Sequence, residues 1–305
     1  MSLDYCDSLF RRVRSCDSLA SISHGLEPIF DRYRPTELEL GRGDVFWRAR
    51  SCDGEPWPSI SDMGAPPSGV AGHGRFNDPG GSLLYTSIRE ETALSEIGVI
   101  VNQVVQVIGY RTVLGEFLRL AVVGDLMHVH KLGYMRFAGS DPDLSVSRYL
   151  NSLGPSRGRE LIYLDAFLHS LLADTEASRN GYVFTRAVAA MIFRNPAIDG
   201  IAFQSAKDPL GYNVVVRPEA AASKLHATSC FQCQVTSIRE FCFTDFRTLR
   251  DAVHLRDGEL FEWDEPLPDG ARRFFNLTKQ EYDTAMALRG DPNAFLAVKG
   301  AHRNR

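Results

Sequence analysis

Short segments with strand patterns are interleaved with segments of helical periodicity along this chain, and this order constrains the fold more than any other feature. In residues 44–50 (DVFWRAR), Val45, Trp47 and Ala49 fall on one face and Arg48 falls on the other, as in a strand. Further strands are expected at 82–87, 104–113, 118–126, 200–205 and 212–219, and helices at 88–99, 160–174 and 182–195, after two short helices within residues 1–40. The pattern predicts a sheet with flanking helices.

An arginine lies within a glycine-rich turn directly before one of these strands, in residues 72–87 (GHGRFNDPGGSLLYTS). The glycines let the backbone turn tightly or approach a ligand closely. Arg75 among them suggests a polyphosphate or carboxylate site, although a solvated surface loop would have the same composition. Ser87 and Glu90 have the spacing of a capping box and predict that a helix begins there.

Composition and charge argue against several classes of function. The formal net charge of −4 is unlike that of a dedicated nucleic-acid binder, and no apolar run approaches the roughly 20 residues of a membrane span. Residues 1–18 carry charge where a signal peptide would need its apolar segment. The six cysteines have no disulfide spacing and predict reduced thiols in a cytoplasmic protein. We therefore expect no nucleic-acid partner and no membrane partner.

One cysteine pair has the spacing of a metal ligand. Cys230 and Cys233 form a CxxC motif, with Cys242 and His226 nearby. A structural zinc site usually has two such pairs, and the second is missing. The pattern favours buried free cysteines, and no metal ligand is expected.

The carboxylate of Glu96 is a candidate functional group because of its place on the helix expected at 88–99. Ala93, Ile97 and Ile100 form an apolar stripe, and Glu96 lies beside it at the edge of the buried face. A carboxylate in this position is either half solvated or directed into a cleft.

Three further residues are ambiguous when each is considered alone. A strand-interior arginine such as Arg48 needs an acidic partner or a ligand anion, and a salt bridge is the simpler explanation. Tyr85 shares a strand face with Leu83 and is expected to be a core aromatic with its hydroxyl at the surface. Ser205 ends a strand before a turn and by itself indicates no function.

Together these segments resemble the RES family, the NAD-consuming domains named for their arginine, glutamate and serine. The segments FWRAR, DMGAPP…GRFN, LLYTS, ETALSE and GIAFQSAKDPLGYNVVV occur in the family's order, from about Asp44 to Val216. The resemblance implies an α+β fold with a mixed or antiparallel sheet of ADP-ribosyltransferase-like type and flanking helices.

The resemblance also implies the catalytic residues. Arg48 in FWRAR, Glu96 in TALSE and Ser205 in FQSAKD match the family's arginine, glutamate and serine. Cleavage of the nicotinamide–ribose bond builds an oxocarbenium-like cation, which a fixed carboxylate stabilises. A serine hydroxyl can position the ribose, or an attacking phosphate or water.

The implied NAD-binding residues lie in and after the glycine-rich turn. Arg75 in GRFN matches a second arginine at the cleft, and two arginines can bind a pyrophosphate through charge-assisted hydrogen bonds. Tyr85 matches an aromatic residue that faces nicotinamide. Gly74 and Asn77, in the same turn as Arg75, are the remaining residues that are expected to bind NAD.

The function implied by the resemblance is cleavage of the nicotinamide–ribose bond of NAD by hydrolysis or phosphorolysis, in a toxin or stress effector. NAD is then a substrate, phosphate is a candidate co-substrate, and no cofactor is expected. A helical antitoxin or immunity protein is the implied partner. ADP-ribosyl transfer to a protein, a catalytically silent binding module and a homo-oligomer remain open alternatives.

The resemblance divides the chain into three parts. Residues 1–40 are expected to form a helical N-terminal extension and residues 41–218 the RES-like catalytic domain. Residues 219–305 are expected to form a C-terminal extension, and both packing on this core and a solvated surface segment remain open for it.

Overall fold

The computed structural model describes residues 2–135, 137, 139–140, 144–267 and 272–281. Its α-helices are α1 (Leu3–Arg14), α2 (Leu19–Phe30), α3 (Ile60–Met63), α4 (Glu90–Ile97), α5 (Asp125–Leu132), α6 (Ser145–Ser152), α7 (Gly154–Leu172), α8 (Val183–Ile192) and α9 (Pro218–Lys224). Its strands are β1 (Thr36–Leu40), β2 (Phe46–Ser51), β3 (Leu84–Ser87), β4 (Val104–Thr112), β5 (Leu118–Val122), β6 (Tyr134–Met135), β7 (Gly139–Ser140), β8 (Gly200–Gln204), β9 (Tyr212–Val216), β10 (Leu225–Ile238), β11 (Thr244–Arg256) and β12 (Leu260–Asp264). Two short 3₁₀ helices are η2 (Ala177–Asn180) and η3 (Glu240–Cys242).

A ten-stranded sheet forms the centre of the fold, in the order β1-β5-β8-β9-β3-β2-β4-β10-β11-β12. Only β5 and β8 pair in parallel, and the other neighbouring strands of this sheet are antiparallel. The mixed sheet and its flanking helices confirm the predicted α+β class. The strands expected between residues 44 and 219 are present as β2, β3, β4, β5, β8 and β9.

Two halves of the sheet meet between β3 and β2. β3 pairs with β9 along its whole length, from Leu84 to Ser87. Its pairing with β2 consists of one register pair, Trp47 with Ser87. Elsewhere the two strands are not in register, so the sheet is open to insertion of side chains at this junction.

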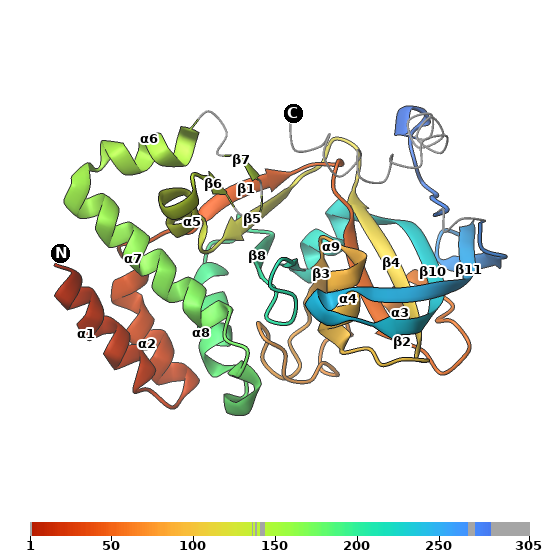
Figure 1. The fold of residues 1–305 in the computed structure, drawn as a ribbon, viewed down its shortest axis with the longest axis horizontal. Helices are drawn as coiled ribbons and strands as arrows, with labels where there is room; N and C mark the ends of the chain where they lie inside the picture. The colour runs from red at the N-terminus through yellow and green to blue at the C-terminus, as the bar shows by residue number, and fades with distance from the viewer. Residues whose placement is uncertain (1, 136, 138, 141–143, 268–271, 282–305) are drawn as a thin grey trace.

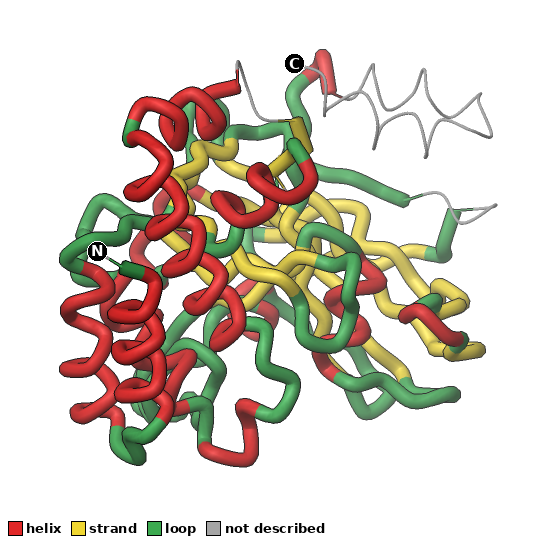
Figure 2. Tube along the Cα trace, turned by 60° about the vertical axis from the view of Figure 1, so that its left-hand side comes forward, coloured by secondary structure: helices red, strands yellow, loops and turns green. Residues whose placement is uncertain are grey.

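Most of the helices cover one face of the sheet, which we call the helical face, whereas the short helices α3 and α9 pack in the core of the opposite face. On β5, β8 and β9 the helical face carries Ala121, Ile201 and Val215, which share a core with α1, α2, α7 and α8. On β2 it carries Trp47, which packs with residues of α4. Figure 1 shows α1, α2, α7 and α8 gathered at one end of the molecule and α4 lying against the strands of the other, and Figure 2 shows the helical group standing beside the strands. No helix within the described ranges is both long and apolar enough to cross a bilayer.

The N-terminal helices are joined to this layer by a buried ion pair. Glu160 of α7 is 1% exposed, accepts a hydrogen bond from Arg32 at 2.5 Å and forms a salt bridge with Arg157 at 2.9 Å. Burial alone raises the pKa of this carboxyl, but its interactions with the two arginines outweigh burial and hold the pKa at about 2. The two helices predicted within residues 1–40 are confirmed as α1 and α2, and they pack as part of the main core.

The opposite face of the sheet is covered in part by the C-terminal part of the chain. β10 pairs with β4, and β11 and β12 continue the sheet beyond it. Phe275 is 6% exposed and packs in the same core as Phe46 and Ile108, and its amide donates to the carbonyl of Thr228 at 2.8 Å. Residues 225–281 thus contribute strands and core side chains to the same sheet as the central part of the chain.

We expect Phe275→Ala to lower the free energy of unfolding by about 3 kcal/mol, because the substitution leaves a cavity beside the sheet. Phe241→Ala is the matched control, since Phe241 is 82% exposed and should change stability by no more than about 0.5 kcal/mol. Thermal or urea unfolding of both full-length variants measures the difference. Equal effects of the two substitutions would show that the C-terminal segment does not belong to the core.

Candidate active site

Glu96 lies in the last turn of α4, and the apolar stripe predicted for this helix is buried at Ala93 but not at Ile97 or Ile100. Thr92, Ala93 and Leu94 are the buried residues of α4, whereas Ile97 and Ile100 are 38% and 67% exposed. The predicted apolar stripe is therefore wrong, because α4 is short and ends at Gly98, which adopts a left-handed conformation. Glu96 is half-buried, at the border between helix and turn.

The capping box predicted for Ser87 and Glu90 is also wrong. Arg89 is the N-cap of α4 and makes no side-chain capping bond. Ser87 ends β3 instead, and its hydroxyl donates to Oδ1 of Asn213 at 2.6 Å. The cap was mispredicted because strand pairing with β9 competes for this serine and draws its side chain into the sheet.

One carboxylate oxygen of Glu96 is held by two donors. Oε1 accepts a hydrogen bond from the Ser205 hydroxyl at 2.6 Å and another from Nδ2 of Asn213 at 2.6 Å. Oε2 accepts no hydrogen bond from the described residues. The carboxylate is therefore oriented through one oxygen, while the other is left for a ligand.

The turn after β8 brings Ser205 to this position. The Ser205 hydroxyl accepts hydrogen bonds from the backbone amides of Lys207 at 3.1 Å and Asp208 at 2.9 Å. The Lys207 ammonium in turn donates to the backbone carbonyl of Glu96 at 2.7 Å. A hydroxyl has one proton and two lone pairs, so these bonds and the bond to Glu96 use the full capacity of Ser205.

A second group of predicted residues surrounds the Tyr85 hydroxyl. This hydroxyl donates to Oδ1 of Asn77 at 2.8 Å and accepts from the backbone amide of Phe76 at 2.9 Å. Gly74 lies directly against it, because a Cβ at this position would be 2.7 Å from the hydroxyl. Burial raises the pKa of Tyr85 to about 12. The hydroxyl was expected at the surface, but the glycine-rich turn encloses it.

Arg75 connects this turn to the helical layer. Its guanidinium donates to the carbonyls of Leu172 at 2.9 Å and Asp174 at 3.1 Å, at the end of α7, and lies over the ring of Tyr182. The Thr185 hydroxyl of α8 donates to the backbone carbonyl of Arg75. Arg75 therefore faces backbone carbonyls in the structure, and these contacts hold the turn in place.

Arg48 lies at the junction between β2 and β3. It pairs with Ile108 of β4 on the face of the sheet opposite Trp47, as the strand pattern predicted, and its guanidinium donates to the Tyr85 carbonyl at 3.2 Å. Nε is buried without a hydrogen-bond partner among the described residues, and burial lowers the pKa of the guanidinium. After burial, the largest electrostatic effects on this pKa come from Tyr110, Arg50 and Tyr85, and none of these residues is a carboxylate. The salt bridge that was the simpler explanation is not formed within the described part of the chain.

Strand pairing places the two groups on the same face of the sheet. Tyr85 and Ser87 are alternate residues of β3, about 6.6 Å apart along the strand, and their register partners on β9 are Val215 and Asn213. Phe76 and Phe203 extend an aromatic surface beside Tyr85, with ring centroids 4.4 Å apart. An aromatic surface and an oriented carboxylate thus lie side by side on the helical face.

The structure adds residues that sequence reasoning missed, chiefly Asn213, Ser87 and Lys207. Asn213 is the one polar residue within the strand segment YNVVV, and all five residues of β9 are buried. A polar side chain in an otherwise apolar buried strand must find hydrogen-bond partners. That signal was available in the sequence, but the identity of its partners depends on the β3–β9 register.

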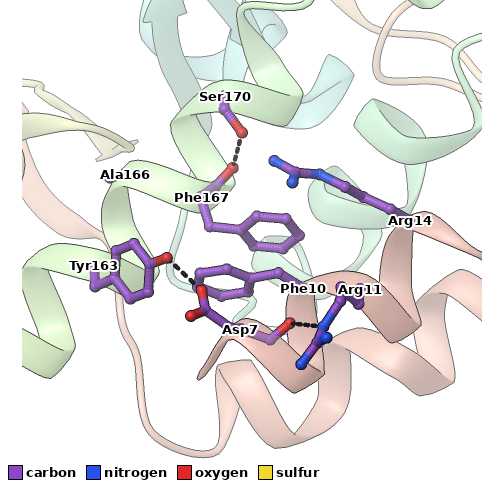
Figure 3. A pocket seen from close by; sticks show the side chains of 8 residues that line it. All are labelled: Asp7, Phe10, Arg11, Arg14, Tyr163, Ala166, Phe167 and Ser170. Atoms are coloured by element: carbon purple, nitrogen blue, oxygen red, sulfur yellow. Dashed lines mark hydrogen bonds between the residues drawn. The ribbon is translucent and has the colours of Figure 1, made fainter. Parts of the chain in front are cut away.

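A cavity of about 520 Å³ lies elsewhere in the molecule, between α1 and α7. Figure 3 shows Phe10 and Phe167 stacked in it, with Arg14 beside them and the Tyr163 hydroxyl directed at Asp7. None of the predicted site residues lines it. All six cysteines are free, and Cys230 and Cys233 are buried. Within the described ranges, no three His, Cys, Asp or Glu side chains are grouped so that they could bind a metal.

Comparison with known proteins identifies a family for most of the chain. The family model described as RES domain matches residues 45–240, which include all of the residues of both groups. No curated protein matches the sequence.

We expect Gly74→Ala to destabilise the protein by about 1–3 kcal/mol, because the new Cβ would lie 2.1 Å from Oδ1 of Asn77 and force apart its bond with Tyr85. Gly72→Ala in the same turn is the control, since no atom lies within 4 Å of its added Cβ. Thermal unfolding measures both. A Gly74→Ala variant as stable as Gly72→Ala would show that the turn does not enclose Tyr85 tightly.

Proposed function

The chain belongs to the RES domain family, and we propose that it cleaves the nicotinamide–ribose bond of NAD by hydrolysis or phosphorolysis. The observation that carries this proposal is the Glu96 carboxylate, oriented through Oε1 by Ser205 and Asn213 and lying on the same face as the ring of Tyr85. This arrangement combines a group that stabilises positive charge with a surface that fits a flat pyridine ring.

The chemistry requires a fixed negative charge near the ribose. When the C–N bond breaks, its electron pair passes to the ring nitrogen, nicotinamide leaves as a neutral molecule, and positive charge develops on the ribosyl carbon. Oε2 of Glu96 can stabilise this charge without reorganising, because Oε1 is already held by two donors. An oxygen of water or phosphate then attacks the cation and forms the new C–O bond, and an attacking water releases one proton to the solvent.

Tyr85 is the proposed wall for the nicotinamide ring. Its hydroxyl is fixed by Asn77 and by the amide of Phe76, so the ring has little freedom to turn. Phe76 and Phe203 support the same surface from behind. Offset stacking of nicotinamide on Tyr85 would place the scissile bond toward Ser87 and Asn213, where the Glu96 carboxylate lies.

Arg48 is the proposed contact for the NAD pyrophosphate. Its side chain leaves β2 on the face opposite the helical face, so it would reach the pyrophosphate at the junction of β2 and β3, where its guanidinium already contacts the Tyr85 carbonyl. A partly exposed guanidinium whose buried Nε has no partner among the described residues, and which has no carboxylate in contact, is well suited to an anion. Arg75 is the second proposed contact. It would have to exchange the carbonyls of Leu172 and Asp174 for phosphate oxygens, so its contribution to NAD binding should be smaller.

Ser205 is assigned a different role from the one that the resemblance first suggested. Its hydroxyl has no remaining capacity for a ribose, phosphate or water, because it donates to Glu96 and accepts two backbone amides. We therefore assign Ser205 to the positioning of Glu96.

The cellular role belongs to the same proposal. An NAD-degrading enzyme in the cytoplasm acts as a toxin or stress effector when it is not inhibited, and a helical antitoxin or immunity protein is the proposed partner. Transfer of ADP-ribose to a protein would pass through the same cation, with an acceptor side chain in place of water or phosphate. A catalytically silent binding module would bind NAD without turnover.

Glu96→Gln should fold normally and lose NAD cleavage, with a decrease in kcat of about 100-fold or more, because glutamine keeps the hydrogen bonds but not the charge. Glu91→Gln, on the same helix, is the control and should retain activity. NAD is incubated with each protein with and without phosphate, and the products are identified by mass. An active Glu96→Gln variant would contradict the catalytic assignment, and a phosphorylated ADP-ribose product would identify phosphorolysis.

Arg48→Ala should raise the KM for NAD by about tenfold, since a hydrogen-bonded charge pair contributes about 1.5–3 kcal/mol. Arg75→Ala should raise it less, because the wild-type guanidinium is already bound to carbonyls. Arg119→Ala is the control, as Arg119 forms an exposed pair with Glu39. If both Arg48→Ala and Arg75→Ala bind NAD like the parent, these arginines are structural and the pyrophosphate contact lies elsewhere.

A further inference from the structure

We propose that Asn213 is a positioning residue for Glu96 and that Ser87 acts behind it, so that the three side chains form a relay from β3 through β9 to α4. The inference rests on the proposed function, because it concerns how the Glu96 carboxylate is oriented. The resemblance to the family assigned no role to Asn213 or Ser87.

The relay is continuous and buried. The Ser87 hydroxyl donates to Oδ1 of Asn213 at 2.6 Å, and Nδ2 of Asn213 donates to Oε1 of Glu96 at 2.6 Å. Ser87 is 2% exposed and Asn213 is 5% exposed. The bond between Ser87 and Asn213 is therefore shielded from water, and its loss would leave buried polar groups unpaired.

Ser87 determines which way the Asn213 amide faces. If the amide were reversed, Oδ1 would face the Glu96 carboxylate oxygen and two acceptors would lie within hydrogen-bond distance of each other. A hydroxyl proton from Ser87 on Oδ1 favours the orientation that directs Nδ2 to Glu96. This selection follows from the register, because Ser87 and Asn213 are direct partners in the β3–β9 pair.

The effect on Glu96 is to favour one rotamer. Nδ2 of Asn213 is one of the two donors that hold Oε1, so removal of Asn213 should leave the carboxylate held by Ser205 alone. The other charged or titratable groups near it face elsewhere: the Lys207 ammonium binds the Glu96 backbone carbonyl, Asp208 accepts from Thr92, and the Cys242 thiol of η3 contacts the Lys207 carbonyl. At the other end of α4, Glu90 pairs with Arg272.

The kinetic test compares full-length variants that each lose one buried hydrogen bond. Asn213→Ala should lower kcat for NAD about tenfold with little change in KM, and Ser87→Ala should lower it about threefold. Ser87→Ala should have no further effect on kcat in the Asn213→Ala background, because Ser87 acts through Asn213. Thr86→Val is the matched control. It removes the buried bond from Thr86 to the Val214 carbonyl and should lose stability without losing kcat.

A second measurement does not depend on turnover. The carboxyl of Glu96 is observed by ¹³C NMR in protein labelled at glutamate, and its signal is assigned by its loss in Glu96→Gln. The chemical shift of this signal should change in Asn213→Ala and in Asn213→Asp, because neither variant keeps the Nδ2 donor on Oε1. The chemical shift should not change in Thr86→Val. Asn213→Asp is nearly isosteric and keeps the packing of β9.

The outcomes separate the two proposals. If the parent cleaves NAD and Glu96→Gln does not, unchanged kcat and an unchanged Glu96 carboxyl signal in the Asn213 variants would overturn the relay alone. If the parent does not cleave NAD, the proposed function is wrong, and the NMR measurement by itself decides whether Asn213 orients Glu96.

Discussion

The register pair between Trp47 and Ser87 is the interaction on which the candidate site depends. It is the one register pair between β2 and β3. It therefore joins the five strands of one half of the sheet, β1-β5-β8-β9-β3, to the five strands of the other half, β2-β4-β10-β11-β12. The ladder alone is weak there, and other contacts cross the junction. Arg48 donates from β2 to the Tyr85 carbonyl of β3, and α4 packs on β2 while Glu96 binds Asn213 of β9. Residues that match the family's arginine and glutamate thus also hold the two halves of the sheet together.

Arg48 and Glu96 thus belong to the site and also connect the two halves of the sheet. This explains why the site can be rigid without being deeply buried. On the helical face, α4 covers one half of the sheet and the group of α1, α2, α7 and α8 covers the other. Tyr85, Ser87 and Asn213 lie between these two coverings. The turn around Gly74 is held to α7 and α8 by Arg75 and Thr185, and the turn after Ser205 is held to α4 by Lys207. The turn on one side of the site is therefore held by α7 and α8, and the turn on the other side is held by α4.

Local patterns predicted the strands and the main helices, because alternation and composition report directly on burial, whereas the site residues were predicted from the resemblance to the RES family. Local patterns failed where contacts between residues far apart in the sequence determine the position of a side chain. Ser87 has the composition of a helix cap, yet its partner is Asn213, which lies 126 positions along the chain. Ile97 and Ile100 fit a buried stripe, yet α4 ends before the helix could bury them. The contacts of Arg75 with α7 and the full coordination of Ser205 likewise depend on tertiary distances that no short segment contains.

The segment beyond residue 240 supports the site although it lies outside the family match. Arg272 pairs with Glu90 at the start of α4 and lies over the ring of Phe231, with its carbon 3.9 Å from the ring centroid. Glu281 pairs with Arg42 at 2.7 Å on the other side of β10. Since α4 carries Glu96, a contact that fixes the first turn of this eight-residue helix also limits how far its last turn can move. The C-terminal part of the chain therefore stabilises the carboxylate from a distance, through the helix that presents it.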